Sequence, residues 1–173
     1  NMASQIVVNA AMHIRGESGQ TNAIVDAQGL ARCFYVTAPG TVLEDLLIRN
    51  GRLSGSLTNM GAGVYAVGTT IRHCAIEQNR LVGVSSGDWV TYVLWGAGAY
   101  LSGGSIEDCV VRDNSATDGQ PRGAGVYATD GAVVSSCIIS DNNAVGGWYA
   151  GGYYGNAAYG GGIYAGSGCT IRL

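Results

Sequence analysis

Residues 61–79 read GAGVYAVGTTIRHCAIEQN, and this pattern returns three more times along the chain. The later copies are GAGAYLSGGSIEDCVVRDN at 96–114, GAGVYATDGAVVSSCIISDN at 123–142 and GGGIYAGSGCTIRL at 160–173. Each copy begins with a glycine-rich block, such as GAGVY at 61–65, and continues with a second block, such as residues 70–79, which ends in Asn in the first three copies. Both blocks keep their form, whereas the segment between this Asn and the next glycines varies in length. This combination is typical of a solenoid, in which the strands must stack in register on the neighbouring coil while the loops between them can vary in length. No apolar stretch sustains a helical period, so the sequence predicts an all-β fold of stacked coils.

Less regular copies of the repeat precede residue 61. Residues 41–50, TVLEDLLIRN, look like the second block, and residues 5–14 and 23–27 are predicted strands of earlier coils. We therefore expect six to seven coils in a single domain that covers residues 1–173. The last repeat stops in mid-block at Leu173, so we expect the domain to be truncated or open at one or both ends. An open end indicates either a fragment of a longer solenoid or end-to-end self-association into a filament.

The glycine-rich block and the Asn block together carry a family resemblance. The GAGV, GAGA and GGGI elements pair with IxxN or VxxN at 76–79, 111–114 and 139–142. They resemble the GGA[ILV] and FxxN repeats of chlamydial polymorphic outer membrane proteins and of related bacterial surface proteins, with Ile or Val in place of Phe. The resemblance implies a single-stranded right-handed parallel β-helix, located outside the cell or at the cell surface. Such motifs specify coil geometry and say little about chemistry.

Composition excludes several classes of function. The chain has nine Arg, no Lys and twelve acidic residues, for a net charge of −3, so it lacks the positive field that holds nucleic acid. No run reaches the 18 apolar residues of a membrane-spanning helix, and we expect no membrane insertion by this segment. The five Cys form no CxxC pair, and we expect neither a metal site nor a cofactor.

Residues in the same slot of successive coils are expected to form ladders. Asn79, Asn114 and Asn142, with Asn50, should lie at one corner, where Asn tolerates the left-handed conformation and its amide can bond to the next coil. We interpret this ladder as structural rather than ligand-binding.

A second predicted ladder consists of cysteines. Cys74, Cys109 and Cys137 share one inward slot, where free Cys serves as a small apolar residue. Adjacent coils are also close enough for a disulfide, although three residues in a row cannot all pair. We favour free thiols, and Cys33 and Cys169 lie outside the ladder.

The glycine-rich blocks place a tyrosine in one shared slot. A stacked ladder of this kind either packs the strands together or offers a platform for sugar rings, and we favour packing. The residues concerned are Tyr65, Tyr100, Tyr127 and Tyr164.

Opposite charges also share slots in neighbouring coils. Each such pair contributes only tenths of a kcal/mol to about 1 kcal/mol, but a register slip would lose all of them together. The pattern therefore favours register control over catalysis. The expected pairs are Arg72 with Glu107, His73 with Asp108, and Glu77 with Arg112.

Aromatic residues gather in the two long variable segments, 80–95 and 143–159, which hold eight of the fourteen in the chain. Both segments leave the same corner of the coil and are predicted to be loops. They either form a contact surface, because Tyr and Trp offer large area at low entropic cost, or cover the solenoid's own apolar flank. The candidate contact residues are Trp89, Tyr92, Trp95, Trp148, Tyr149, Tyr153 and Tyr154.

The acidic residues do not form the clusters expected of a β-helical polysaccharide-degrading enzyme. Such enzymes need grouped Asp for Ca²⁺ or paired carboxylates, and here Glu107, Asp108 and Asp113 each have an Arg, His or Asn neighbour. We expect a non-catalytic extracellular module, either an adhesin-like surface β-helix or a subunit of a head-to-tail filament. The alternative is a β-helix that binds or cleaves host or matrix carbohydrate through the aromatic loops.

Overall fold

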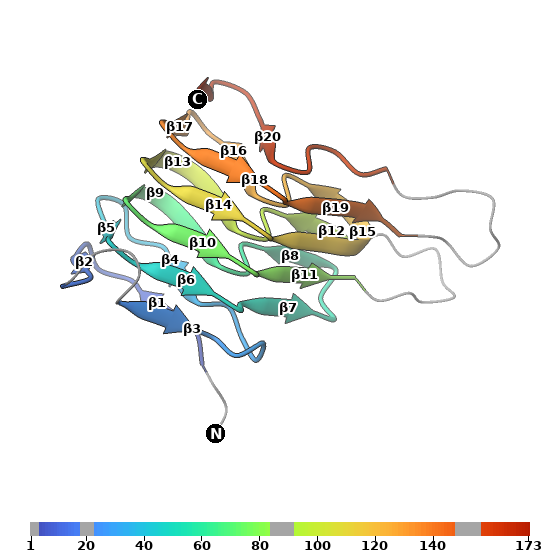
Figure 1. The fold of residues 1–173 in the computed structure, drawn as a ribbon, viewed down its shortest axis with the longest axis horizontal. Coiled ribbons are helices and arrows are strands. Elements are labelled where there is room, and N and C mark those ends of the chain that lie inside the picture. Colours follow the sequence, from blue (N-terminus) through green and yellow to red (C-terminus); the bar gives the residue numbers. More distant parts are fainter. Residues whose placement is uncertain (1–3, 18–22, 84–91, 148–156) are drawn as a thin grey trace.

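The computed structural model describes residues 4–17, 23–83, 92–147 and 157–173. Within these residues the regular structure consists of β-strands, most of them three residues long, without a helix. It follows that no helix in the described part could cross a membrane. The strands wind into six successive coils that stack from the N-terminal to the C-terminal end (Figure 1).

The strands fall into coils as follows. The first coil holds β1 (Ile6–Val8), β2 (His13–Arg15) and β3 (Ile24–Asp26). The second holds β4 (Phe34–Val36), β5 (Val42–Glu44), β6 (Leu47–Arg49), β7 (Arg52–Ser54) and β8 (Thr58–Met60). The third holds β9 (Val64–Arg72), β10 (Ala75–Glu77), β11 (Arg80–Val82) and β12 (Val93–Trp95). The fourth holds β13 (Ala99–Glu107), β14 (Val110–Arg112) and β15 (Ser115–Arg122). The fifth and sixth hold β16 (Val126–Thr129), β17 (Val133–Ser135), β18 (Ile138–Ser140), β19 (Asn143–Gly146), β20 (Ile163–Ala165) and β21 (Thr170–Arg172).

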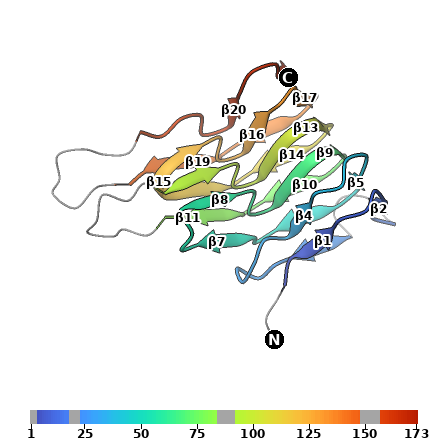
Figure 2. The same cartoon turned by 180° about the vertical axis from the view of Figure 1, so that it is seen from behind.

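Stacking of the coils produces three parallel sheets. The first has ten strands and includes the series β1-β4-β9-β13-β16-β20, which is visible from behind in Figure 2. The second has five strands in the order β18-β14-β10-β6-β3, and the third has six, built on β7-β11-β15-β12-β8. Every pair is parallel and joins neighbouring coils, which is the arrangement of a parallel β-helix. The predicted solenoid of six to seven coils is confirmed.

The register matches the repeats in the sequence. Tyr100 lies opposite Tyr65 on one side and Tyr127 on the other, and Ile106 lies opposite Ile71 and Val134. Ile71, Ile106 and Val134 point inward, are fully buried and stack on one another from coil to coil. The apolar core is therefore a set of parallel columns inside the helix.

Left-handed residues turn the coil at two corners. His73 (φ 50°) lies between β9 and β10, and Gln78 (φ 58°) lies between β10 and β11. The chain therefore bends at His73, which lets both Ile71 and Cys74 point into the core. The same two positions are left-handed in neighbouring coils, at Asp45, Asp108 and Ser136 for the first corner and at Asn50, Asp113 and Asp141 for the second.

The asparagine corner differs from the prediction in two ways. The left-handed residue precedes the Asn ladder, so Asn79 itself points inward and is fully buried. Asn50 aligns with Gln78 instead of Asn79, because β6 pairs with β10 one position away from the alignment expected from the sequence. Gly51 takes the Asn position in that coil, where an added Cβ would lie only 2.0 Å from the Ala62 carbonyl oxygen.

The variable segments are also more regular than expected. Residues 80–95 contribute two strands, β11 and β12, and residues 143–159 begin with β19. Trp95 therefore lies in a strand, and its prediction as a loop residue is wrong. The short segment 115–122 is one continuous strand, β15, which pairs with both β11 and β12. The third sheet needs these strands to close each coil, which is why they persist despite the variable lengths around them.

Candidate functional site

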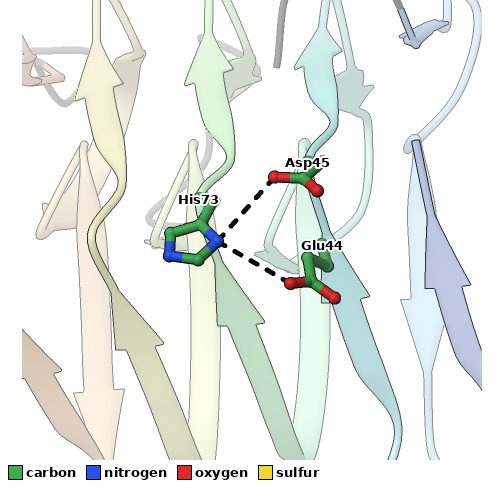
Figure 3. Close-up of side chains that lie close together, drawn as sticks. All are labelled: Glu44, Asp45 and His73. Carbon is green, nitrogen blue, oxygen red and sulfur yellow. Dashed lines mark ion pairs between the residues drawn. The ribbon is translucent and has the colours of Figure 1, made fainter. Parts of the chain in front are cut away.

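Two acidic residues and a histidine meet at the first corner of the coil (Figure 3). Glu44 ends β5, and Asp45 follows it in the left-handed position. His73 occupies the equivalent corner position of the next coil, directly after β9. The turn aims these side chains away from the core, so the stacking of two coils is what brings them together.

Ion pairs connect the cluster to its surroundings. The imidazole Nδ1 of His73 lies 3.7 Å from Glu44 Oε1 and 3.8 Å from Asp45 Oδ1. Glu44 Oε2 also lies 2.6 Å from the Nε2 atom of His13. Arg72 donates from Nη2 to Glu44 Oε2 at 3.1 Å, and Arg15 Nε donates to Asp45 Oδ2 at 3.2 Å. Each carboxylate therefore has a permanently charged partner.

The electrostatic effect on Glu44 follows from these contacts. Its side chain is only 10% exposed. The hydrogen bond from Arg72 holds the pKa of Glu44 below its ordinary value, burial acts in the opposite direction, and the contact with His13 lowers the pKa further. The carboxylate is thus kept ionised, which is the opposite of what a general acid requires.

The cluster belongs to longer charge ladders that run along the helix axis. Glu107 shares the slot of Arg72 as predicted, while the guanidinium of Arg72 forms its ion pair with Glu44 on the preceding coil. His73 Nε2 lies 3.9 Å from Asp108 Oδ2, and Arg112 Nη2 lies 2.7 Å from Glu77 Oε2. The signs alternate from coil to coil, which supports a role in register.

Glu44, Asp45 and His73 present ligand atoms within 4.8 Å of one another, a spacing that could hold a metal ion. A divalent cation would have to compete with Arg72 and Arg15 for both carboxylates. The arrangement is therefore that of a satisfied ion-pair network. The sequence signal for it was the Glu-Asp pair in 41–50, which the one-residue misalignment of that segment concealed.

The asparagine ladder satisfies backbone groups inside the second corner. Asn114 Oδ1 accepts from the backbone N and from Nδ2 of Asn79, each at 3.0 Å. Asn142 Oδ1 accepts from the same two atoms of Asn114, at 3.1 and 2.9 Å. Asn79 Oδ1 in turn accepts from the Gly51 N–H at 2.8 Å. These contacts link four coils, which agrees with the structural interpretation.

The cysteine ladder repeats one geometry. Cys74, Cys109 and Cys137 each place Sγ 3.1–3.2 Å from the carbonyl oxygen two residues earlier and 3.6 Å from a carbonyl of the preceding coil. All five cysteines of the chain are free thiols. Hydrogen bonds to Cys137 and Cys74 raise the pKa of the Cys109 thiol. The hydrogen bond with Cys109 lowers the pKa of Cys137 to about 7, and burial raises the pKa of Cys33 to about 12.

The tyrosines form a continuous stack. Ring centroids are 5.0 Å apart between Tyr65 and Tyr100, 5.4 Å between Tyr100 and Tyr127, and 5.2 Å between Tyr127 and Tyr164. Tyr35 extends the stack at 4.9 Å from Tyr65; the sequence missed it because no GAG block precedes it. The ring faces contact each other and are not free to receive a sugar ring, so the stack favours packing over a binding platform.

Two further residues complete this stack. Trp95 lies 4.7 Å from Tyr127 and 6.4 Å from Tyr100, almost parallel to both rings. The Arg122 guanidinium lies 5.9 Å from the Trp95 ring and 5.3 Å from the Tyr164 ring. Tyr92 is half-buried and packs against the small apolar cluster beneath β11 and β12. The other candidate contact residues, Trp89, Trp148, Tyr149, Tyr153 and Tyr154, lie outside the described residues, and their contact role stays a prediction.

Comparison with known proteins identifies the architecture. The protein-family model for the right-handed β-helix region matches residues 40–172, which is most of the chain. The comparisons with curated proteins and with solved structures found no match. The family match agrees with the parallel coils, the three sheets and the stacked ladders. The chain belongs to the right-handed β-helix family.

Proposed function

We propose that this β-helix is a non-catalytic structural and interaction module, displayed outside the cell or at its surface in the manner of an adhesin or of a filament subunit. Right-handed β-helices are compatible with surface proteins and with carbohydrate-active proteins. The family alone therefore does not select between these roles, and the choice rests on the chemistry of the side chains.

The observation that carries the proposal is that both carboxylates of the Glu44–Asp45–His73 cluster are already engaged in ion pairs. A catalytic carboxylate must exchange a proton with its substrate or attack it as a nucleophile. Glu44 is bound by Arg72 and His13, and Asp45 by Arg15. These contacts join neighbouring coils and hold them in register, so the cluster serves the scaffold.

The test separates a scaffold from an enzyme. The protein is incubated with polyuronates and with neutral polysaccharides, while new reducing ends and the ultraviolet absorbance of unsaturated products are followed. We expect no turnover above that of heat-denatured protein, and we expect Glu44→Gln to lower the melting temperature. Turnover that disappears in a folded Glu44→Gln variant would overturn the proposal.

Carbohydrate recognition through the aromatic segments is the second candidate. It is favoured by the concentration of eight of the fourteen aromatic residues in segments 80–95 and 143–159. Titration with neutral oligosaccharides, followed by tryptophan fluorescence in the parent and in Trp89→Ala and Trp148→Ala variants, tests it. Binding that both substitutions abolish would support this candidate, and unchanged fluorescence throughout would contradict it.

A further inference from the structure

Arg52 and Arg80 form a like-charged pair on the third sheet. They begin β7 and β11, and the register places them directly opposite each other. The backbones of such neighbouring strands are about 4.8 Å apart. In the described strands, six other directly paired positions join an acidic residue to an arginine. Like charges in this arrangement destabilise a sheet. The pair therefore opposes the charge pattern that the rest of the fold follows.

Most other arginines of the described chain have a clear partner. Arg15, Arg49, Arg72 and Arg112 form ion pairs. Arg32 and Arg122 lie over aromatic rings. By contrast, Arg52 and Arg80 are exposed and form no ion pair with an acidic residue among the residues that the structure describes.

These two arginines line a polar groove at the second corner of the coil. The groove has a volume of about 310 Å³ and is also lined by Gln28, Asn50 and Gln78. The Asn50 amide is already bonded to Asp26, whereas Gln28 and Gln78 are exposed. Past Arg52 a second hollow of about 440 Å³ continues over Leu30 and Leu53.

We infer that this corner groove, defined by Arg52, Arg80, Gln28 and Gln78, binds an acidic oligosaccharide. Guanidinium groups bind carboxylate or sulfate groups through paired, charge-assisted hydrogen bonds. Primary amides both donate and accept, which suits sugar hydroxyl groups. Leu30, 60% exposed, offers an apolar surface to the C–H face of a sugar ring.

Other anionic ligands fit less well. A peptide that adds to a sheet needs an open strand edge. β10 and β11 beside the groove are paired on both sides, and β7 at the edge of the third sheet is only three residues long and already bonds its Arg52 N–H to the Ala31 carbonyl oxygen. Nucleic acid is disfavoured by the net charge of −3. Recognition at this corner must come from side chains, and those present match a ligand that carries both anionic groups and hydroxyls.

The inference rests on the proposed interaction role and names a ligand class for it, yet the two can fail separately. Loss of acidic-sugar binding would remove the ligand and leave the non-catalytic scaffold in place. Turnover of a polysaccharide would remove the scaffold proposal but would still require binding at a defined groove.

The experiment measures binding by calorimetry with three hexasaccharides: an oligouronate, a sulfated oligosaccharide and a neutral one. A hexaglutamate peptide serves as the anionic control. We expect binding of at least one acidic oligosaccharide, weakened by added salt, and at least tenfold weaker binding of the neutral sugar and of the peptide. The preferred acidic sugar distinguishes a carboxylate from a sulfate ligand. Equal binding of the peptide, or absence of binding to both acidic sugars, would overturn the inference.

Variants locate the site. Arg52→Glu places opposite charges across β7 and β11, so we expect an unchanged or higher melting temperature together with at least a tenfold loss of binding. Arg52→Ala with Arg80→Ala should show the same loss. Arg172→Ala removes an exposed arginine far along the axis and should bind as the parent does. A folded Arg52→Glu variant with parental affinity would overturn the assignment of the site.

Discussion

The indole ring of Trp95 lies 4.7 Å from the phenol ring of Tyr127, and the two ring planes differ by only 7°. Trp95 belongs to β12 in the third sheet, whereas Tyr127 belongs to β16 in the first. The contact therefore ties two sheets and two coils together through a single side chain. It makes the aromatic stack part of the scaffold.

We predict that Trp95→Ala lowers the free energy of unfolding by about 2–4 kcal/mol. The change removes a large half-buried ring that packs on Tyr127 and lies beneath the Arg122 guanidinium. Urea denaturation followed by circular dichroism measures the effect. Trp95→Phe is the control, because it keeps an aromatic ring at this position and should lose less than half as much. Equal stability of the Ala variant and the parent would show that the stack contributes nothing.

The asparagine ladder gives a second prediction. Asn114→Ala should lower the free energy of unfolding by about 3 kcal/mol, because it removes the acceptor of the buried Asn79 N–H and the side-chain hydrogen bond to the Ile76 carbonyl. Asn50→Ala is the matched control. Asn50 lies one position away from the ladder and bonds to Asp26 at the surface, so its loss should have less than half of this effect. Similar effects of the two substitutions would contradict the observed register.

The sequence predicted the coil and its ladders but misplaced features that the repeat does not encode. Glycine blocks set the alignment of Tyr65, Tyr100, Tyr127 and Tyr164, because only those blocks keep a fixed distance to the tyrosine. Tyr35 and Trp95 reach the same stack from segments without the motif. Their positions depend on how each coil closes in space, which a pattern along one strand does not contain.

The charged sites show the same limit. Opposite charges within the regular repeats, such as Glu77 and Arg112, could be paired from the sequence because their slots are equivalent. The Glu44–His73 contact was missed because one residue of displacement at 41–50 changes every assignment that follows. Arg52 and Arg80 went unnoticed because a groove arises from the shape of two corners and has no signature in the sequence.

The cysteine ladder provides the third prediction. Cys109→Asp should prevent folding, because Cys109 is 1% exposed within the apolar core, where a carboxylate would lose its hydration. Cys109→Ala should cost only about 1–2 kcal/mol, since it leaves a small cavity. Circular dichroism and thermal melting distinguish the two. A folded Asp variant with the parental melting temperature would show that this slot faces water.

The last prediction concerns acid pH and follows from Glu44 and Asp26. Burial raises the pKa of Asp26. Hydrogen bonds from Asn50, from the Gln28 backbone and from Arg49 together lower it by a larger amount, so the net pKa is below the ordinary value. The pKa of Glu44 is lowered chiefly by the hydrogen bond from Arg72. A carboxyl group whose pKa is lower in the folded chain stabilises the fold above its unfolded pKa, about 3.9 for Asp and 4.3 for Glu. This contribution disappears as the pH falls through the folded pKa.

We therefore expect the melting temperature to fall as the pH drops below about 5. Glu44→Gln should have a lower melting temperature at pH 7 and a shallower fall in acid, so that its curve approaches that of the parent near pH 3. Asp130→Asn is the control, because the Asp130 carboxylate is exposed and its only hydrogen bond among the described residues is with the Ser102 hydroxyl, so this variant should keep the parental profile. Parallel curves for the Glu44→Gln variant and the parent across this range would mean that the ion pairs of the first corner add no pH-dependent stability.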